Sequence, residues 1–354
     1  MMTKRFGTKF AALGTAGVLA FAVQAAADEY PATKFTVQGG WATGGIFTEY
    51  EIPFWKERIP KLSGGKVTAH LTNLNEMGLK GPEVFRLLKI GVIDFGTSVL
   101  GYVAGDHPEN EGADIGGAAT DAKSARAAVD AWRPVLEELY TKKYAVKPIM
   151  FYPAEAQAIF CNAEITGLDD FKGKKIRVWN RSMADFVEAV GATSITMAFS
   201  EVVPSLQRKV IDCAITGTFS GNSAKWYEVA THLYPLPLGW SVFMYAASIK
   251  SWQSLDPKVR TLVETEMKKL ENEMWEGGAY RTQQGIDCNT GADTCEKGTK
   301  QSMKLVPISA TDKARAKTII EENILPGWAK RCGADCSKKW NETVGKVLGL
   351  TAKM

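Results

Sequence analysis

The sequence predicts an α/β protein of two domains, for three reasons. Short apolar runs alternate with amphipathic helical patterns along most of the chain. These runs fall into two sets, so two sheets fit better than one. A charged helical pattern from Asp256 to about Gln284 is long enough to span both domains. With 354 residues, 45% of them hydrophobic, the chain can bury a large core, and its length favours about two domains.

The first set of elements has the order βαβαβ. Strands are expected at residues 34–39, 66–72 and 92–98, with helices at 46–59 and 82–91 between them. This order implies a parallel sheet whose crossovers are right-handed.

The second set follows a helix that is expected at residues 121–142. Its strands are expected at 146–152, 158–162, 174–179, 194–199 and 210–216, with helices at 182–190 and 200–208. No internal repeat or low-complexity segment interrupts either set.

The first 27 residues have the pattern of a secretory signal peptide. Three basic residues among the first nine precede an apolar run over residues 10–23, and small residues at 25–27 form the expected cleavage site. The alternative is a membrane anchor, but the apolar run is shorter than the ~20 residues that span a bilayer. Cleavage removes three positive charges and no negative ones, so the formal net charge falls from +4 to +1. A nearly neutral mature chain gives no reason to expect a nucleic acid or a membrane surface as a partner.

The six cysteines agree with export, because an oxidising compartment favours an even set of paired cysteines. Two pairs each bracket a short polar loop and can close a small ring. The expected pairs are Cys288 with Cys295, Cys332 with Cys336 and, by elimination, Cys161 with Cys213. Metal binding is the alternative, although these spacings do not match those of structural zinc sites.

No catalytic or cofactor motif is present. The three histidines are scattered, and the chain has no HExxH, GxSxG or CxxC motif. The glycines around Trp41 do not complete the GxGxxG pattern of a dinucleotide site. Asp287, Asn289 and Asp293 resemble part of a calcium loop, but the final glutamate is missing. The sequence therefore predicts neither a cofactor nor an enzyme.

A ligand-binding site remains, and Arg177 is its strongest candidate. Arg177 interrupts an apolar strand near its carboxyl end, and ligands of open α/β sheets bind outside the carboxyl ends of strands. A guanidinium is permanently charged and presents a fork of donors that matches a carboxylate. The alternative is a salt bridge from Arg177 to Asp185 or Glu188.

The sequence around Arg177 closely resembles a known family. Residues 171–217 are similar to the central block of the solute-binding proteins of TRAP transporters, the tripartite ATP-independent periplasmic carriers of the DctP type. The matching motifs are LDDFKGKKIRV, GATxxxMxFSEV and LQRKVID. EVFRLLKIGVID at 83–94 resembles an earlier block of the family. The resemblance covers essentially the whole mature chain.

The resemblance implies a periplasmic-binding-protein fold, in which hinge strands and a long helix join two α/β lobes. Lobe I is expected at residues 28–152 with 241–280, and lobe II at 153–240 with 281–354. The resemblance also implies that the lobes close on a small organic acid in the periplasm. The acid would then pass to the membrane subunits of a TRAP permease, which an ion gradient drives. The binding protein itself is expected to be a monomer.

Two departures from the family pattern bear on the ligand. The carboxylate-binding arginine of the family corresponds to Arg177, but a second arginine of relatives falls at Gln157, and an asparagine falls at Thr216. Gln157 brings no charge, so a second carboxylate would be poorly balanced in a closed, dry cleft. A monocarboxylate is therefore favoured.

Aromatic side chains near the expected cleft would enclose an aromatic body or stack on a sugar acid. Trp179 and Trp240 are the preferred ligand contacts. The other candidates are Trp41, Tyr152, Phe219 and Phe243, with Thr97, Ser98, Asn180 and Asn222 as polar contacts. Two other functions stay open: a ligand sensor that presents an organic acid to a membrane receptor, and an exported α/β enzyme.

Overall fold

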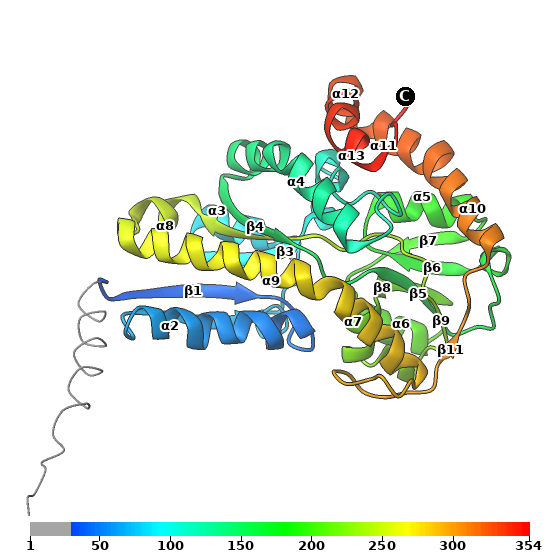
Figure 1. The fold of residues 1–354 in the computed structure, drawn as a ribbon, viewed down its shortest axis with the longest axis horizontal. Helices are drawn as coiled ribbons and strands as arrows, with labels where there is room; N and C mark the ends of the chain where they lie inside the picture. Colours follow the sequence, from blue (N-terminus) through cyan, green and yellow to red (C-terminus); the bar gives the residue numbers. More distant parts are fainter. Residues whose placement is uncertain (1–29) are drawn as a thin grey trace, which may run out of the picture.

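The computed structural model describes residues 30–354 and contains two α/β lobes joined by a long helix (Figure 1). Lobe I is built on a five-stranded sheet and lobe II on a six-stranded sheet. The predicted fold class is thus confirmed. The predicted signal peptide lies outside the described residues. Within residues 30–354, no helix is both long and apolar enough to cross a membrane.

The sheet of lobe I has the strand order β2-β1-β3-β10-β4. Its strands are β1 (Thr33–Gly39), β2 (Val67–Asn73), β3 (Phe95–Val99), β4 (Val146–Tyr152) and β10 (Phe243–Ser248). The first three strands are parallel, as the βαβαβ order predicts, but β10 inserts antiparallel between β3 and β4. The parallel arrangement of these three strands is therefore confirmed, but the whole sheet is mixed, because a strand from much later in the chain completes lobe I. The expectation that the strand at 146–152 opens the second sheet is wrong, since β4 pairs with β10.

The sheet of lobe II has the order β11-β9-β5-β8-β6-β7. Its strands are β5 (Gln157–Cys161), β6 (Lys175–Val178), β7 (Thr193–Thr196), β8 (Cys213–Gly217), β9 (His232–Tyr234) and β11 (Lys304–Leu305). Strand β6 is parallel to β7 and β8, whereas β5 is antiparallel to β8 and β9. The carboxyl end of β6 and the amino end of β5 therefore lie at the same end of the sheet, along the strand direction.

Helices cover both sheets. The longer ones are α3 (Val84–Ile90), α4 (Ala122–Leu139), α5 (Arg181–Ala189), α6 (Val202–Gln207), α7 (Thr218–Ser223), α8 (Ile249–Ser254) and α9 (Pro257–Thr290). A continuous helical segment after β1 comprises η1 (Phe47–Glu51), η2 (Phe54–Arg58) and α2 (Ile59–Leu62). The shorter turns are η3 (Leu100–Val103), η4 (Pro108–Glu111), η5 (Tyr140–Tyr144), η6 (Leu168–Phe171), η7 (Phe199–Glu201) and η8 (Trp226–Glu228).

The chain crosses between the two sheets at residues 153–156 and again at 235–242. The two crossovers are hydrogen-bonded to each other, because the Ala154 amide donates to the Trp240 carbonyl at 3.0 Å and the Gln157 amide donates to the Gly239 carbonyl at 2.8 Å. Helix α9 is a third connection, since it packs on β4 of lobe I and on α7 of lobe II (Figure 1). These three segments form the hinge.

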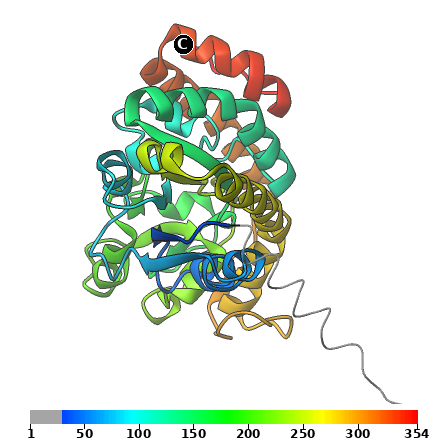
Figure 2. The ribbon, with the colours of Figure 1, turned by 90° about the vertical axis from the view of Figure 1, so that its left-hand side faces the viewer.

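The C-terminal helices contact both lobes. They are α10 (Ala310–Ile319), η9 (Ile320–Ile324), α11 (Leu325–Cys332), α12 (Ala334–Trp340), η10 (Asn341–Gly345) and α13 (Lys346–Leu348). They pack against α5 of lobe II and against α4 beside lobe I, and Figure 2 shows them as a layer at one end of the molecule. The domain limits expected from the sequence stay a prediction, since residues 310–348 contact both lobes.

All three expected disulfides are present, and no free cysteine is left among the described residues. Cys161 and Cys213 are paired residues of the neighbouring strands β5 and β8, so their disulfide links two adjacent strands of lobe II. Cys288 and Cys295 join the end of α9 to the loop that follows it, and Cys332 and Cys336 join α11 to α12.

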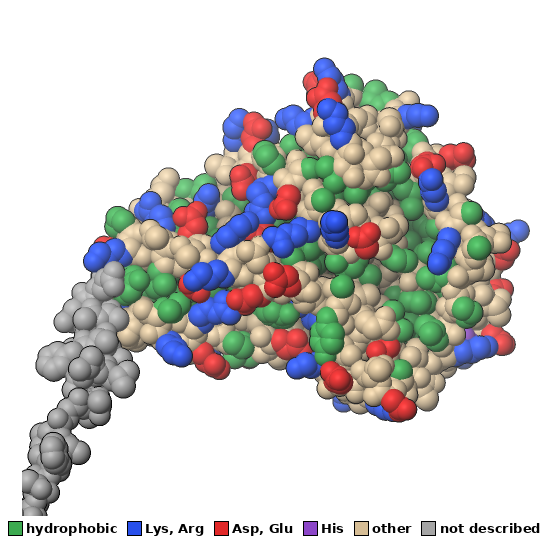
Figure 3. All heavy atoms as spheres, in the orientation of Figure 1, with side chains coloured by type: hydrophobic (Ala, Val, Ile, Leu, Met, Phe, Trp, Pro, Cys, Tyr) green, Lys and Arg blue, Asp and Glu red, His purple; other side chains and the backbone are tan. Residues whose placement is uncertain are grey.

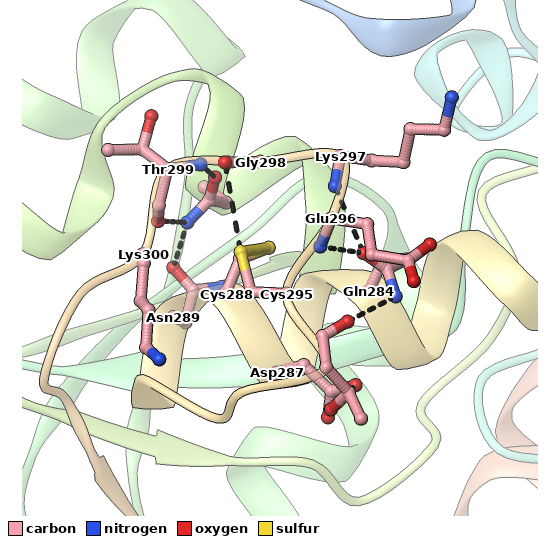
Figure 4. Close-up of a disulfide and its surroundings, with 12 residues drawn as sticks. Gln284, Asp287, Cys288, Asn289, Cys295, Glu296, Lys297, Gly298, Thr299 and Lys300 are labelled. Atoms are coloured by element: carbon pink, nitrogen blue, oxygen red, sulfur yellow. Dashed lines mark hydrogen bonds between the residues drawn. A yellow bond between two sulfur atoms is a disulfide. The ribbon is translucent and has the colours of Figure 1, made fainter.

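Hydrogen bonds and the Cys288–Cys295 disulfide hold the loop after α9 (Figure 4). The Gln284 side chain accepts from the amides of Glu296 and Lys297 and donates to the Thr294 carbonyl. Asp287 accepts from the hydroxyl of Thr294 at 2.7 Å. Across residues 30–354, no three His, Cys, Asp or Glu side chains are grouped as a metal site.

Candidate functional site: a cavity between the lobes

A cavity lies where the two lobes meet, next to the hinge. Its volume is about 50 Å³. Among its lining residues are Trp41, Tyr102 and Phe243 from lobe I, and Gln157, Arg177, Trp179, Phe199 and Thr216 from lobe II. Both lobes thus contribute walls to one enclosed space, which is the usual position of a ligand site between domains.

Arg177 lies on β6 with its side chain only 1% exposed. Its Nε donates to the Met197 carbonyl at 3.1 Å and its Nη1 to the Ile215 carbonyl at 2.8 Å. The third nitrogen, Nη2, is buried and has no hydrogen-bond partner. Burial lowers the pKa of Arg177, but a guanidinium stays charged in proteins. The cavity therefore contains a fixed positive charge with an unsatisfied donor.

The salt bridges expected as an alternative for Arg177 are absent. Asp185 instead accepts from Arg181 at 3.1 Å and from Arg331 at 2.7 Å, and Glu188 accepts from Arg181 at 2.9 Å. The acid whose charge acts on Arg177 is Glu201, and it is bound to Lys80 across the lobes at 2.7 Å. No carboxylate of the described residues lies within salt-bridge distance of Arg177.

Gln157 of β5 and Thr216 of β8 line the cavity together with Arg177, and β8 lies between β5 and β6 in the sheet. Gln157 is held from both ends of its amide. Its oxygen accepts from the Trp179 indole nitrogen at 3.1 Å, and its nitrogen donates to the Glu155 carbonyl at 3.0 Å. Two hydrogen bonds therefore fix the orientation in which Gln157 faces the cavity.

Aromatic rings form most of the remaining wall. Trp41 lies 5.4 Å from Phe199 and 6.0 Å from Phe243 between ring centroids, and Tyr102 lies 6.2 Å from Trp179. The Trp41–Phe199 and Tyr102–Trp179 pairs each join one lobe to the other. Edge-on and tilted contacts of this kind are favourable beyond the apolar area that they bury.

Tyr102 and Phe199 are cavity residues that the sequence analysis missed. Each follows a strand, since Tyr102 lies in η3 after β3 and Phe199 begins η7 after β7. The strand predicted at 194–199 in fact ends at Thr196, which leaves Phe199 free to turn toward the cavity. A search of the residues just after each parallel strand would have found both.

Several predicted site residues lie outside the cavity lining. The Trp240 indole donates to the Ala119 carbonyl at 3.1 Å, on the far side of its crossover. The hydroxyls of Tyr152 and Thr97 are bonded to each other inside lobe I, and Ser98 donates to the Gly81 carbonyl at 2.9 Å. These side chains are buried, and their polar groups are hydrogen-bonded within the protein outside the cavity lining.

The remaining predicted contacts also have structural partners. Asn180 caps the start of α5 by accepting from the Met183 amide at 2.9 Å. Asn222 binds the loop after α9 through the backbone of Thr299. Phe219 does not line the cavity, although a side chain at Gly45, which does, would lie 2.8 Å from its ring.

A buried acid stands directly behind the cavity wall. Glu51 is 1% exposed, and its carboxylate accepts from the Gly40 amide at 2.7 Å and from the Tyr152 hydroxyl at 3.4 Å. Burial raises the pKa of Glu51 to about 7, since these two hydrogen bonds only partly compensate for lost hydration. The loop that carries Gly40 and Trp41 thus rests on a carboxyl group that titrates near neutral pH.

The sequence profile of DctP, family 7 of the bacterial extracellular solute-binding proteins, matches residues 48–325. The chain belongs to this family. Members of DctP family 7 are solute-binding receptors of TRAP transporters rather than enzymes, and they act outside the cytoplasm. The resemblance drawn from the motifs around Arg177 is therefore confirmed, and the reading of the chain as an exported enzyme is wrong.

The chain is also similar to curated periplasmic binding proteins. It is 25% identical over 195 residues to the C4-dicarboxylate-binding periplasmic protein DctP of Rhodobacter capsulatus, covering 55% of this chain and 54% of that protein. The alignments with the first curated relatives span 39% to 54% of the relatives' own lengths.

Two solved structures share the fold over nearly their whole length. DctP7 of Bordetella pertussis, an extracytoplasmic solute receptor binding pyroglutamic acid, gives a TM-score of 0.75 at 21% identity and covers 88% of this chain and 99% of that one. The periplasmic ectoine-binding protein of the TeaABC TRAP transporter of Halomonas elongata gives a TM-score of 0.76 at 17% identity, covering 89% and 99%. At these identities the likeness shows the two-lobed fold alone.

Proposed function

We propose that this DctP-family protein captures a small organic monocarboxylate in the periplasm by closure of its two lobes and delivers it to a TRAP permease. The observation that carries the proposal is Arg177. Its Nη2 is buried, has no hydrogen-bond partner and belongs to a side chain that lines the cavity. An unsatisfied buried donor on a charged group is costly, and a ligand carboxylate would satisfy it.

The charge balance of the cavity favours one carboxylate over two. Among the described residues that line the cavity, Arg177 is the only cation. Gln157 is neutral, and its amide is already bonded to Trp179 and to the Glu155 carbonyl. A second buried carboxylate would lose its hydration without gaining an opposite charge.

The aromatic walls favour a ligand with a flat or ring-shaped body. Trp41, Tyr102, Trp179, Phe199 and Phe243 surround the space next to Arg177. Rings of this kind stack on aromatic bodies or on the C–H face of a sugar acid. The proposed ligand is therefore a compact monocarboxylate with an aromatic or sugar-acid body.

The enclosure of the cavity supports the proposed lobe closure. Arg177 is almost fully shielded from solvent, and Trp41 of lobe I contacts Phe199 of lobe II over the cavity. A ligand reaches Arg177 only when the lobes move apart about the crossovers and α9. Domain closure about a few connecting segments is a common binding motion of two-lobed proteins.

The test is a binding screen of the mature chain from Asp28. Organic acids would be ranked by thermal shift, since a ligand at ~100 times its Kd stabilises the folded state by ~2.7 kcal/mol. Titration calorimetry would then compare wild type with Arg177→Ala, which should lose about 2–5 kcal/mol of binding free energy.

Arg181→Ala is the matched control, because Arg181 pairs with Asp185 and Glu188 on the outside of α5. It should bind as wild type does. Unchanged affinity in Arg177→Ala would remove Arg177 from the site. Stabilisation by dicarboxylates alone would contradict the charge argument. Delivery would be tested by deleting the gene and measuring uptake of the acid that binds.

A further inference from the structure

Tyr102 is a lobe I residue that shares the cavity lining with Arg177 of lobe II. It belongs to η3, immediately after β3, and it lines the cavity. Its ring packs edge-on against Trp41 at 6.1 Å and against Trp179 at 6.2 Å. A Cβ at Gly81 would lie 2.6 Å from the ring, so the backbone of Gly81 is packed closely against the ring of Tyr102. Packing on three sides therefore fixes the ring of Tyr102.

Tyr102 and Arg177 line the same cavity from opposite lobes, and the charge of Arg177 acts on the Tyr102 hydroxyl. Burial raises the pKa of Tyr102, and the positive charge of Arg177 only partly opposes this. The phenol thus stays protonated and can donate a hydrogen bond. Tyr102 nevertheless leaves Nη2 of Arg177 without a hydrogen-bond partner. Two donors from opposite lobes consequently face the same small space.

A carboxylate fits between these two donors. It has two oxygens with about four acceptor positions, so one group can accept from a guanidinium and from a hydroxyl at the same time. Nε and Nη1 of Arg177 are each bound to a backbone carbonyl, which orients Nη2 toward its unfilled position. The oxygen that Arg177 leaves unsatisfied needs a second donor, and Tyr102 is the donor that lobe I supplies.

We propose that Tyr102 is the lobe I half of a carboxylate clamp, in which its hydroxyl donates to the ligand carboxylate that Arg177 binds from lobe II. This inference rests on the proposed function and adds a specificity-determining residue to it. The clamp links binding to closure, because the two halves reach one carboxylate only when the lobes are together. An acid held by Arg177 alone would be bound without holding the lobes closed.

The test compares Tyr102→Phe with wild type. The probes are pyroglutamate, lactate, benzoate and orotate, with affinity measured by calorimetry and closure by small-angle X-ray scattering. Tyr102→Phe keeps the ring and its packing but removes the donor. Loss of a hydrogen bond to a charged group should weaken binding ~10-fold to ~100-fold. Tyr280→Phe is the matched control, because the exposed Tyr280 hydroxyl donates to Glu296 away from the cavity.

A double-mutant cycle separates a clamp from a purely structural role. In the Arg177→Ala background, Tyr102→Phe should have little further effect on affinity, since the carboxylate has already lost its main anchor. If the losses of binding free energy in the two single variants add up to the loss in the double variant, the clamp is overturned. Wild-type affinity and closure in Tyr102→Phe, together with loss of binding in Arg177→Ala, would overturn the clamp while the proposed function stands. If none of the four acids binds the wild type, the proposed function and the clamp both fail.

Discussion

The buried carboxyl group of Glu51 should make the protein less stable as the pH rises. Its pKa is about 7 in the folded chain, against 4.5 for an unperturbed carboxyl. The unfolded chain therefore releases this proton at lower pH than the folded chain does. Between about pH 4.5 and pH 7 the folded state binds more protons, so stability falls as the pH rises through this window. For one such group the loss between pH 5 and pH 8 is about 2.5 kcal/mol.

Glu51→Gln should abolish this loss. Glutamine keeps the acceptor for the Gly40 amide and offers a donor to the Tyr152 hydroxyl, so the local packing is preserved. The variant should gain about 2–3 kcal/mol over wild type at pH 8 relative to pH 5. Asp114, whose pKa burial raises to about 6, shifts stability in the same direction, but it is present in both proteins and cancels in the comparison.

The assay is urea unfolding followed by tryptophan fluorescence at pH 5 and pH 8, at constant ionic strength. Glu276→Gln on the exposed face of α9 is the control, and it should differ from wild type equally at both pH values. The same difference at both pH values for Glu51→Gln would refute the reasoning. That result would mean that Glu51 is hydrated or paired in solution.

Two further predictions concern the disulfides and the lobe contact. Replacing both Cys161 and Cys213 by alanine opens a loop of 52 residues and should lower the free energy of unfolding by ~4 kcal/mol. The same change at Cys332 and Cys336, which are four residues apart, should lower it by ~2 kcal/mol. Equal losses of unfolding free energy in urea would contradict the argument from loop length. Gly101→Ala would place a Cβ 2.4 Å from Trp179 of the other lobe, so it should weaken acid binding by about 1–3 kcal/mol and increase the radius of gyration in X-ray scattering. Gly105→Ala is the control, because its Cβ meets no neighbour, and it should leave both the affinity and the radius unchanged. Wild-type affinity in Gly101→Ala would show that closure does not need this contact.

Much of lobe I could be predicted because its first elements are local in sequence. Alternating patterns located β1, β2 and α3 to within two residues. The third strand was predicted to begin at residue 92, yet β3 begins at Phe95. The reason is the end of α3, where Gly91 adopts a left-handed conformation and the Val92 amide turns back to bond the Leu87 carbonyl at 3.0 Å.

The position of β10 could not be predicted from such patterns. Its residues, FMYAAS, are buried throughout and show no alternation, because the strand lies between β3 and β4 inside lobe I. Its antiparallel pairing with strands far away in sequence is set by the crossovers, which no local pattern encodes.

The sequence singled out the charged candidate of the site, Arg177, more readily than it singled out the aromatic residues of the cavity. Arg177 was recognised because a charged side chain inside an apolar strand is costly to bury unless it binds a partner. Trp240 and Trp179 look alike in sequence, but the Trp240 indole is bonded to the Ala119 carbonyl outside the cavity lining, whereas Trp179 lines the cavity. Tyr102 reaches Arg177 only through the meeting of the lobes, which is a property of the folded chain.

The insertion of β10 also determines the order in which the protein can fold. When residues up to Tyr152 have been synthesised, β3 and β4 both exist, but the strand that lies between them does not. Lobe I is then a split sheet with two open edges, and such edges are prone to pair with other chains. Lobe II, whose strands β5 to β9 are continuous in sequence and lack only the two-residue edge strand β11, can assemble most of its sheet first. Lobe I must wait for residue 248, so folding should begin in the middle of the chain.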